Sequence, residues 1–347
     1  MLPVHSLRPE TLGPLLAELA APAYHAGQIL AWIYRRGVSD PHEMTDLPAA
    51  LRAELTRALA PPTIELALVS RAADGTRKLA LRLGDGEVIE SVLIPDRHRL
   101  TLCVSSQVGC AMGCSFCATA RLGLRRHLRP EEIVGQVIHA RMELAREPLG
   151  GGQLTNLVFM GMGEPLHNLD ALLGALAILT RPWGLGISPR RITVSTVGLI
   201  PEMQRLLAET AVNLAVSLSA TTDASRRRLM PVTRKYGLEK LVAACRELPL
   251  PRRRRITFEY VLLAGENDSI DDARQLVSLL HGVRAKVNLI HFNPFPGSGH
   301  SASPHARVDL FQRCLLDHGV NATVRESRGS DIAAACGQLA AQAASAA

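Results

Sequence analysis

The first part of the chain carries apolar residues at helical spacing. Leu12, Leu15, Leu16 and Leu19 recur every three or four positions, as expected for one face of an α-helix. Similar spacing continues to about residue 60, and several prolines interrupt it. This pattern predicts a small N-terminal unit of short helices.

After about residue 62, the spacing between apolar residues changes from three or four positions to two. Apolar and polar residues alternate in Leu79–Leu83 and again near Val88–Ile94. Turns are indicated at Asp74-Gly75 and at Gly84-Asp85-Gly86. Residues 64–102 therefore read as a β meander that leads into the next part of the chain.

From about residue 100 apolar strand-like segments alternate with amphipathic helical ones. The candidate strands are Leu157–Met160, Ile192–Thr196, Asn213–Ser219, Thr257–Leu263, Lys286–Phe292 and Ala322–Arg325. The candidate helices are Pro130–Glu143, Leu169–Leu179, Ile200–Glu209, Leu238–Leu248, Asp271–His281 and Arg307–His318. This alternation predicts parallel strands and an α/β fold of βα units. In a βα barrel the site lies at the C-terminal ends of the strands, so we expect functional residues there.

Composition favours a globular chain with a polyanionic partner. The 347 residues are 47% hydrophobic, and no apolar run reaches the roughly 18 residues that span a membrane. Residues 1–9 show no apolar signal region, so we expect a cytoplasmic protein. The net charge is +7, and basic residues gather at Arg121–Arg129, Arg226–Arg228 and Arg252–Arg255. Three such clusters favour a nucleic-acid surface, although any single cluster fits a solvated loop or helix end.

Three cysteines within eight residues are the strongest chemical signal. Cys110, Cys114 and Cys117 follow an apolar stretch and can converge on one point. A structural zinc ion would need four ligands, and no second pair is nearby, although Cys103 could be a fourth. Three thiolates instead suit a [4Fe–4S] cluster with one iron left open for a small molecule.

The other candidate residues are ambiguous by spacing alone. Gly163 and Glu164 follow a predicted strand and could hold an ammonium group, or form an ordinary strand-end turn. Cys336 lies among small residues that would let other molecules approach its sulfur, whereas Cys103 is by default a small buried residue. Glu90 is a carboxylate within an apolar strand and could simply face solvent.

The cysteine motif, Cys-x-x-x-Cys-x-x-Cys with an aromatic residue before the last cysteine, resembles the signature of radical S-adenosylmethionine (SAM) enzymes. The chain further resembles the RlmN/Cfr family of RNA adenine methyltransferases nearly end to end. The matching segments are 28–34, 109–118, 160–165, 194–196, 229–231, 288–296 and 329–339.

This resemblance implies a partial (β/α)6 radical SAM barrel. The expected organisation is an N-terminal helical RNA-docking domain at 1–62, a β linker at 63–99, the barrel at 100–339 and an Ala-rich tail at 340–347. The implied SAM contacts are Gly163, Glu164, Ser195, Ser217, Leu218, Ser219 and Asn293. The implied cofactors are a [4Fe–4S] cluster on Cys110, Cys114 and Cys117, and SAM itself.

The resemblance also implies a chemistry for the remaining cysteines. In the family one SAM methylates the cysteine matching Cys336, and a second SAM is cleaved to a 5′-deoxyadenosyl radical that activates this methyl group. The methylene radical adds to an adenine carbon, and the cysteine matching Cys103 releases the product as a disulfide forms. Glu90 matches the family's proton-accepting glutamate.

The expected substrate is an adenine of 23S ribosomal RNA, and of transfer RNA, methylated at C2. Ala120, His127, Val197 and Ser219 depart from the usual family residues. These departures leave the RNA target and the target carbon, C2 or C8, open. Two further alternatives are a different radical SAM enzyme with a small-molecule substrate and a non-catalytic iron–sulfur RNA-binding or assembly protein. We expect a monomer with an external electron donor and no membrane association.

Overall fold

The computed structural model describes residues 1–97, 99–251 and 253–340. The Ala-rich tail therefore lies outside the described residues except for Ala340, as does Arg252 of the third basic cluster. No helix in the described ranges is long and apolar enough to cross a membrane.

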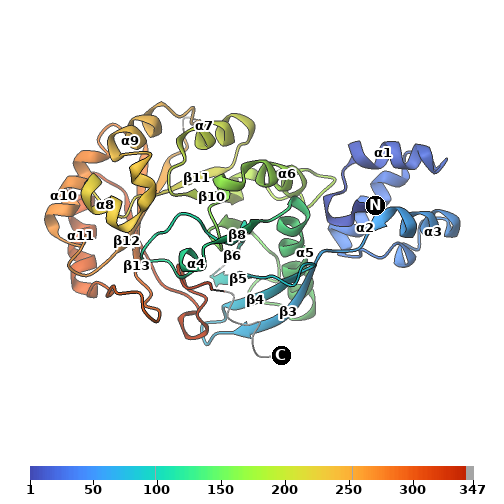
Figure 1. Cartoon of the computed structure of the whole chain (residues 1–347), viewed down its shortest axis with the longest axis horizontal. Coiled ribbons are helices and arrows are strands. Elements are labelled where there is room, and N and C mark those ends of the chain that lie inside the picture. Colours follow the sequence, from blue (N-terminus) through green and yellow to red (C-terminus); the bar gives the residue numbers. More distant parts are fainter. Residues whose placement is uncertain (98, 252, 341–347) are drawn as a thin grey trace.

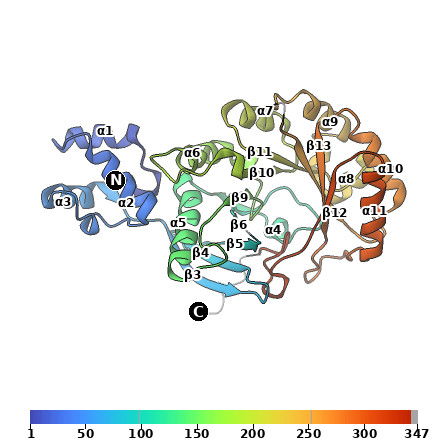
Figure 2. The ribbon, with the colours of Figure 1, turned by 180° about the vertical axis from the view of Figure 1, so that it is seen from behind.

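The N-terminal helices form a unit at one end of the molecule, beside the barrel (Figures 1 and 2). The helices are α1 (Pro9–Glu18), α2 (His25–Arg36) and α3 (Ala49–Ala58), and the short strands β1 (Leu2–Pro3) and β2 (Leu59–Ala60) pair in parallel. The predicted helical positions Leu12 and Leu16 are buried, so their spacing correctly located the inner face. Arg8 joins this unit to the barrel by donating to the backbone oxygen of Gly174 at 3.2 Å.

One ten-stranded sheet runs through the rest of the described chain, in the order β14-β13-β12-β11-β10-β9-β6-β5-β4-β3. Its strands are β3 (Ile64–Arg71), β4 (Arg77–Leu83), β5 (Val88–Asp96), β6 (Arg99–Cys103), β9 (Asn156–Phe159), β10 (Ile192–Thr196), β11 (Asn213–Ser217), β12 (Ile256–Leu262), β13 (Ala285–His291) and β14 (Ala322–Arg325). The first four pair antiparallel, and every pair from β6 to β14 is parallel. The predicted meander is confirmed, and it shares one sheet with the barrel strands.

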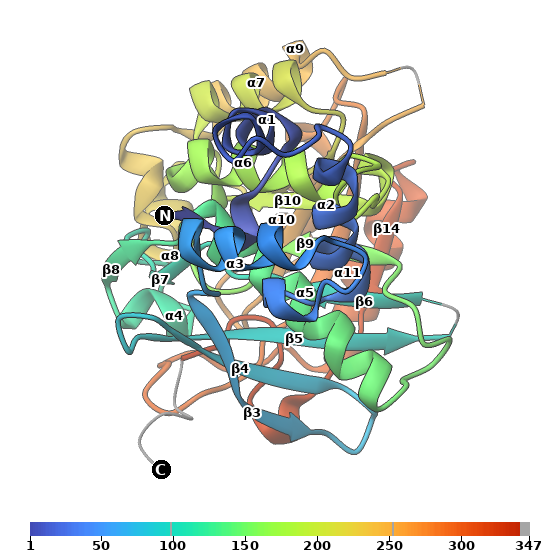
Figure 3. The ribbon, with the colours of Figure 1, turned by 90° about the vertical axis from the view of Figure 1, so that its right-hand side faces the viewer.

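The parallel strands curve, and helices cover their outer face (Figures 1 and 3). These helices are α5 (Pro130–Arg146), α6 (Leu169–Thr180), α7 (Ile200–Glu209), α8 (Asp223–Leu229), α9 (Leu238–Glu247), α10 (Ile270–Leu279) and α11 (His305–Asp317). The predicted α/β barrel fold is confirmed, and each predicted strand and helix lies within three residues of an observed one.

Three short elements near the cysteine motif were not predicted. A hairpin of β7 (Gln107–Gly109) and β8 (Leu124–His127) brackets the helix α4 (Ala118–Arg121). The motif itself is the loop between β7 and α4. The parallel strands all end at the same edge of the sheet, so this loop meets their C-terminal ends.

Candidate active site

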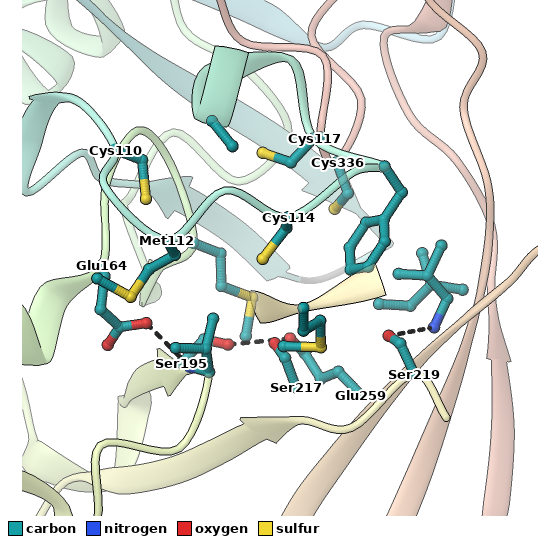
Figure 4. Close-up of a pocket in the computed structure, with 18 of the residues that line it drawn as sticks. Cys110, Met112, Cys114, Cys117, Glu164, Ser195, Ser217, Ser219, Glu259 and Cys336 are labelled. Atoms are coloured by element: carbon teal, nitrogen blue, oxygen red, sulfur yellow. Dashed lines mark hydrogen bonds between the residues drawn. The ribbon is translucent and has the colours of Figure 1, made fainter. Parts of the chain in front are cut away.

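A cavity opens at the C-terminal ends of the barrel strands, beneath the cysteine loop (Figure 4). It is lined by Cys110, Cys114 and Cys117 on one side and by residues of the strand ends on the other. Of the predicted SAM contacts, Gly163, Glu164, Ser195, Ser217, Ser219 and Asn293 line it. Leu218 does not, because its side chain is fully buried and only its backbone participates, donating to Glu259 O at 2.8 Å.

The cysteine loop turns its three sulfur atoms toward a common space (Figure 4). Within the described residues, no three ligand side chains stand close enough to hold a single metal ion. A zinc site requires such convergence, whereas a cubane binds its thiolates through separate irons and needs a wider space. The arrangement therefore fits the [4Fe–4S] cluster better than zinc.

Gly109, at the end of β7, allows the chain to turn into the cysteine loop. Gly109 has φ +77°, and a Cβ there would lie 1.8 Å from the backbone oxygen of Gly123. That same oxygen accepts the N–H of Cys110 at 2.9 Å. The close approach of the two backbones thus fixes the first cysteine of the loop.

The segment after β9 places a buried carboxylate in the cavity. Gly163 has φ +100° and packs its backbone against Gln107, leaving no room for a side chain. Glu164 accepts the N–H of Val197 at 2.9 Å and that of Leu166 at 3.1 Å. Burial raises the pKa of the Glu164 carboxyl to about 7, although these hydrogen bonds lower it. The Thr196 side chain also donates to this carboxylate, which leaves acceptor capacity for one further donor such as an ammonium group.

Polar groups from the next strands form the opposite wall. Ser219 adopts φ +49°, an uncommon conformation for a residue with a side chain, and its Oγ accepts the N–H of Val261 at 3.2 Å. Asn293 follows β13 and donates to the backbone oxygen of Cys336 at 3.2 Å. The asparagine therefore links this wall of the cavity to the segment that carries the exposed Cys336.

The sequence patterns did not identify two charged residues in this region, Glu259 and Arg325. Arg325 is described with the second cavity below. Glu259, in the middle of β12, accepts the Ser195 hydroxyl at 3.0 Å, while its buried Oε1 has no hydrogen-bond partner in the described protein. Burial raises the pKa of this carboxyl, and Arg325 and Ser195 lower it. A carboxylate within the apolar strand Ile256–Leu262 was a signal that could have identified it. Its orphaned oxygen suits a polar group of a bound ligand, such as a hydroxyl of SAM.

Cys336 lies between the first cavity and a second one. It lines both, and Cys103, the last residue of β6, lines the second. Both are free thiols, and burial raises the pKa of Cys103 to about 12 while Arg325 opposes this. Arg325 ends β14 and lines the second cavity, and negative charge on Cys336 would raise the pKa of its guanidinium. The structure thus brings together the two cysteines that the resemblance paired.

We call residues 326–340, which carry Cys336, the C-terminal strap. Asp74 accepts the N–H of Gly329 at 3.0 Å, and Asp331 accepts that of Ala73 at 3.0 Å. On the other side, the N–H of Ala118 donates to Gly337 O at 2.7 Å. The strap therefore bridges the β meander and the cysteine loop.

Glu90 lies under this strap. Its carboxylate is fully buried, 3.0 Å from Lys78 Nζ, and accepts the N–H of Ala340 at 3.0 Å. It is not among the described residues lining either cavity. The reading of Glu90 as a solvent-facing residue is therefore wrong.

The basic clusters differ from the sequence expectation. Arg125, Arg126 and Arg129 pair with the carboxylates of Glu87, Asp85, Glu131 and Glu132. Arg226 is fully buried and donates to the backbone oxygens of Leu218, Val197 and Ser217 and to the Thr233 hydroxyl. The prediction that Arg226 contacts phosphate is wrong, because its guanidinium is buried and joins the ends of β10 and β11.

Comparison with known proteins agrees with this geometry. A model described as the radical SAM superfamily matches residues 104–277, and a ribosomal RNA large subunit methyltransferase N-terminal domain matches residues 4–60. The dual-specificity RNA methyltransferase RlmN of Syntrophotalea carbinolica is 52% identical over 95% of this chain and 87% of its own length. The dual-specificity RNA methyltransferase RlmN of Anaeromyxobacter dehalogenans is 50% identical over 98% of this chain and 92% of its own length.

A solved structure gives the same result in three dimensions. A radical SAM methyltransferase from Sphaerobacter thermophilus superposes with a TM-score of 0.94 and 44% identity, covering 99% of this chain and all of that one. Because these relatives match nearly the whole chain, including the N-terminal helices and the cysteine loop, the chain belongs to the RlmN family of radical SAM methyltransferases.

Proposed function

We infer that this protein methylates C2 of an adenine in 23S ribosomal RNA and in transfer RNA. The observation that carries this conclusion is the position of Cys336 between two cavities. The cysteine loop and SAM-facing residues line one cavity, and Cys103 lines the other. A carrier of a one-carbon unit must meet both a radical source and a resolving thiol, and the position of Cys336 between the two cavities supports that role.

Each described residue then has a proposed task. When bound, SAM and the cluster supply one-electron cleavage chemistry. Cys110, Cys114 and Cys117 would hold the cluster, and Glu164 would bind the SAM ammonium group together with the other wall residues. Cys336 would carry the methyl group, and Cys103 would attack its sulfur to release the product, leaving a disulfide that two electrons reopen. Glu90 would accept a proton, with Lys78 as its counter-charge.

We also propose that the protein is a cytoplasmic monomer that receives electrons from a separate donor. All seven cysteines are free, as a reducing compartment would keep them. Light scattering should then give a mass near the 37.4 kDa of one chain.

The test is an anaerobic reaction of the reconstituted protein with SAM, dithionite and unmodified 23S RNA fragments, read by nucleoside mass spectrometry. We expect 2-methyladenosine from the wild type. Cys336→Ala should retain iron, sulfide and RNA affinity yet transfer no methyl group. Cys314→Ala, on α11 away from both cavities, serves as the matched control and should behave as wild type.

Other reaction products would change the proposed substrate or target carbon. Formation of 8-methyladenosine would keep the mechanism and change the target carbon. If SAM yields 5′-deoxyadenosine while RNA stays unmodified, the substrate assignment fails. Full methylation by Cys336→Ala would refute the role of this cysteine as the carrier.

A further inference from the structure

A hydroxyl group of the cysteine loop is joined to a distant part of the chain. Ser115 directly follows Cys114 and lies two residues before Cys117. Its Oγ lies 2.9 Å from Nε2 of His300, a residue 185 positions further along the chain. The other ring nitrogen of His300, Nδ1, forms a hydrogen bond with the carboxylate of Glu266. We call these three bonded residues, none of which lines either cavity, the outer chain.

The hydrogen bonds of the outer chain fix the Ser115 hydroxyl beside two of the three cysteines. An ionised carboxylate only accepts hydrogen bonds, so Nδ1 of His300 carries the proton that faces Glu266. In the neutral ring, Nε2 accepts the proton of the Ser115 hydroxyl, and in the charged ring Nε2 donates to the hydroxyl oxygen. The His300 side chain is 11% exposed, and its ring lies edge-on to that of Phe292 with 5.9 Å between the centroids. This packing holds the imidazole in place.

The far end of the outer chain is anchored on the sheet. Glu266 lies in the turn that follows β12. The buried Asn267 fixes this turn, because its side chain accepts the N–H of Leu263 at 2.7 Å. The N–H of Ala264 donates to the backbone oxygen of Ser301 at 2.9 Å, so the turn also holds the segment that carries the histidine. The outer chain thus connects the cysteine loop to a strand end.

A second contact joins the same segment to the other flank of the cysteine motif. Arg121, at the end of α4, donates to the backbone oxygen of Pro296 at 3.3 Å. Its guanidinium also lies 5.0 Å from the centre of the Phe295 ring. The segment that ends at the histidine is therefore bound on both sides of Cys117, to Ser115 before it and to Arg121 after it.

We propose that the outer chain positions the cysteine loop for cluster binding, and that it thereby controls how firmly the cluster is held and the cluster's reduction potential. This inference rests on the proposed function only in assigning the cluster to Cys110, Cys114 and Cys117. Outer-shell hydrogen bonds orient metal ligands, and their loss typically costs about 10- to 100-fold in metal affinity. Hydrogen bonding and solvent exposure also set the reduction potential of iron–sulfur clusters. The outer chain acts through the cysteines, so its members are positioning residues.

The experiment removes members of the outer chain from the full-length protein. After anaerobic reconstitution, we measure the release of iron to a chelator, the midpoint potential of the cluster and the electron paramagnetic resonance spectrum of its reduced form. We expect His300→Ala and Ser115→Ala to release iron about tenfold faster than wild type and to change the potential and the spectrum. His318→Ala is the matched control and should match wild type. Its Nδ1 also donates one hydrogen bond, to Cys314 O at 2.7 Å, but it follows α11 and lines neither cavity.

Further variants distinguish positioning from a general loss of stability. Glu266→Gln keeps an oxygen that can accept from Nδ1 and should behave as wild type, whereas Glu266→Ala should match His300→Ala. The double variant Ser115→Ala/His300→Ala should release iron no faster than either single variant, because both residues act in one chain. Wild-type iron release, potential and spectrum in His300→Ala would overturn the proposal, as would additive effects in the double variant. Failure of the proposed function would appear separately, as a wild type that holds its cluster yet leaves RNA unmodified.

Discussion

Glu164 illustrates how one buried side chain can control ligand binding. Its carboxylate accepts two backbone N–H groups and lines the first cavity, where we propose that SAM binds. Burial raises its pKa to about 7, so in the ligand-free protein it is protonated below that pH and charged above it. If Glu164 holds the ammonium group of SAM, as we propose, the charged carboxylate is the binding form, and binding below pH 7 must displace a proton.

We therefore predict that SAM affinity is constant above about pH 7 and falls as the pH drops below it, approaching a factor of about ten per pH unit. Calorimetry of the full chain at several pH values would measure this profile. Glu164→Gln should bind SAM weakly, with little pH dependence in this range. An unchanged pH profile in that variant would place the titrating group elsewhere.

Among the elements, the β7–β8 hairpin depends on a glycine at position 109. Gly109 places its backbone against Gly123, and this contact positions Cys110. Alanine at 109 would meet both a positive φ and a backbone oxygen 1.8 Å from its Cβ. We predict that Gly109→Ala loses most of its iron and sulfide on reconstitution while its far-ultraviolet circular dichroism stays unchanged.

Gly123→Ala is the matched control. Gly123 also has a positive φ, +66°, but its Cβ would meet no atom within 4 Å. It should lose only about 1 kcal/mol of unfolding free energy and retain its cluster. If Gly109→Ala takes up a full cluster, the close backbone contact does not position Cys110.

At the level of single helices and strands, some elements could be predicted from the sequence and others could not. Strands such as β10 and helices such as α7 were placed to the residue, because their hydrophobic period records which side chains face the core. Helix α8 was missed because three consecutive arginines hide its short apolar pattern. The burial of Arg226 and the cavity position of Arg325 depend on carbonyls and thiols from distant strands, which no local pattern shows.

For the molecule as a whole, the C-terminal strap is the connection that completes the site. Asp74 accepts the N–H of Thr76 in its own turn and that of Gly329 in the strap. We predict that Asp74→Ala makes the amides of residues 329–339 exchange with deuterium about fivefold faster, because one part-buried hydrogen bond holds the strap by roughly 1 kcal/mol. Exchange in the central strands should not change.

Asp85→Ala is the comparison. Asp85 also accepts an N–H two residues ahead, from Glu87, in a turn of the same meander, but its other partner is Arg126 rather than the strap. Mass-spectrometric exchange should show no faster opening of the strap in this variant. Equal exchange of residues 329–339 in both variants would mean that Asp74 does not fasten the strap.

The strap also has a consequence for the order of folding. Its bonds to the meander join residues 255 and 258 positions apart, so closing them carries a large entropic cost until the sheet between them exists. They should therefore form last. Cys103 should then be buried at the end of β6 before Cys336 reaches it, and the two thiols should meet only in an almost complete molecule. A newly made chain is thus guarded, by the sequence of its own folding, against oxidising this pair before the catalyst is assembled.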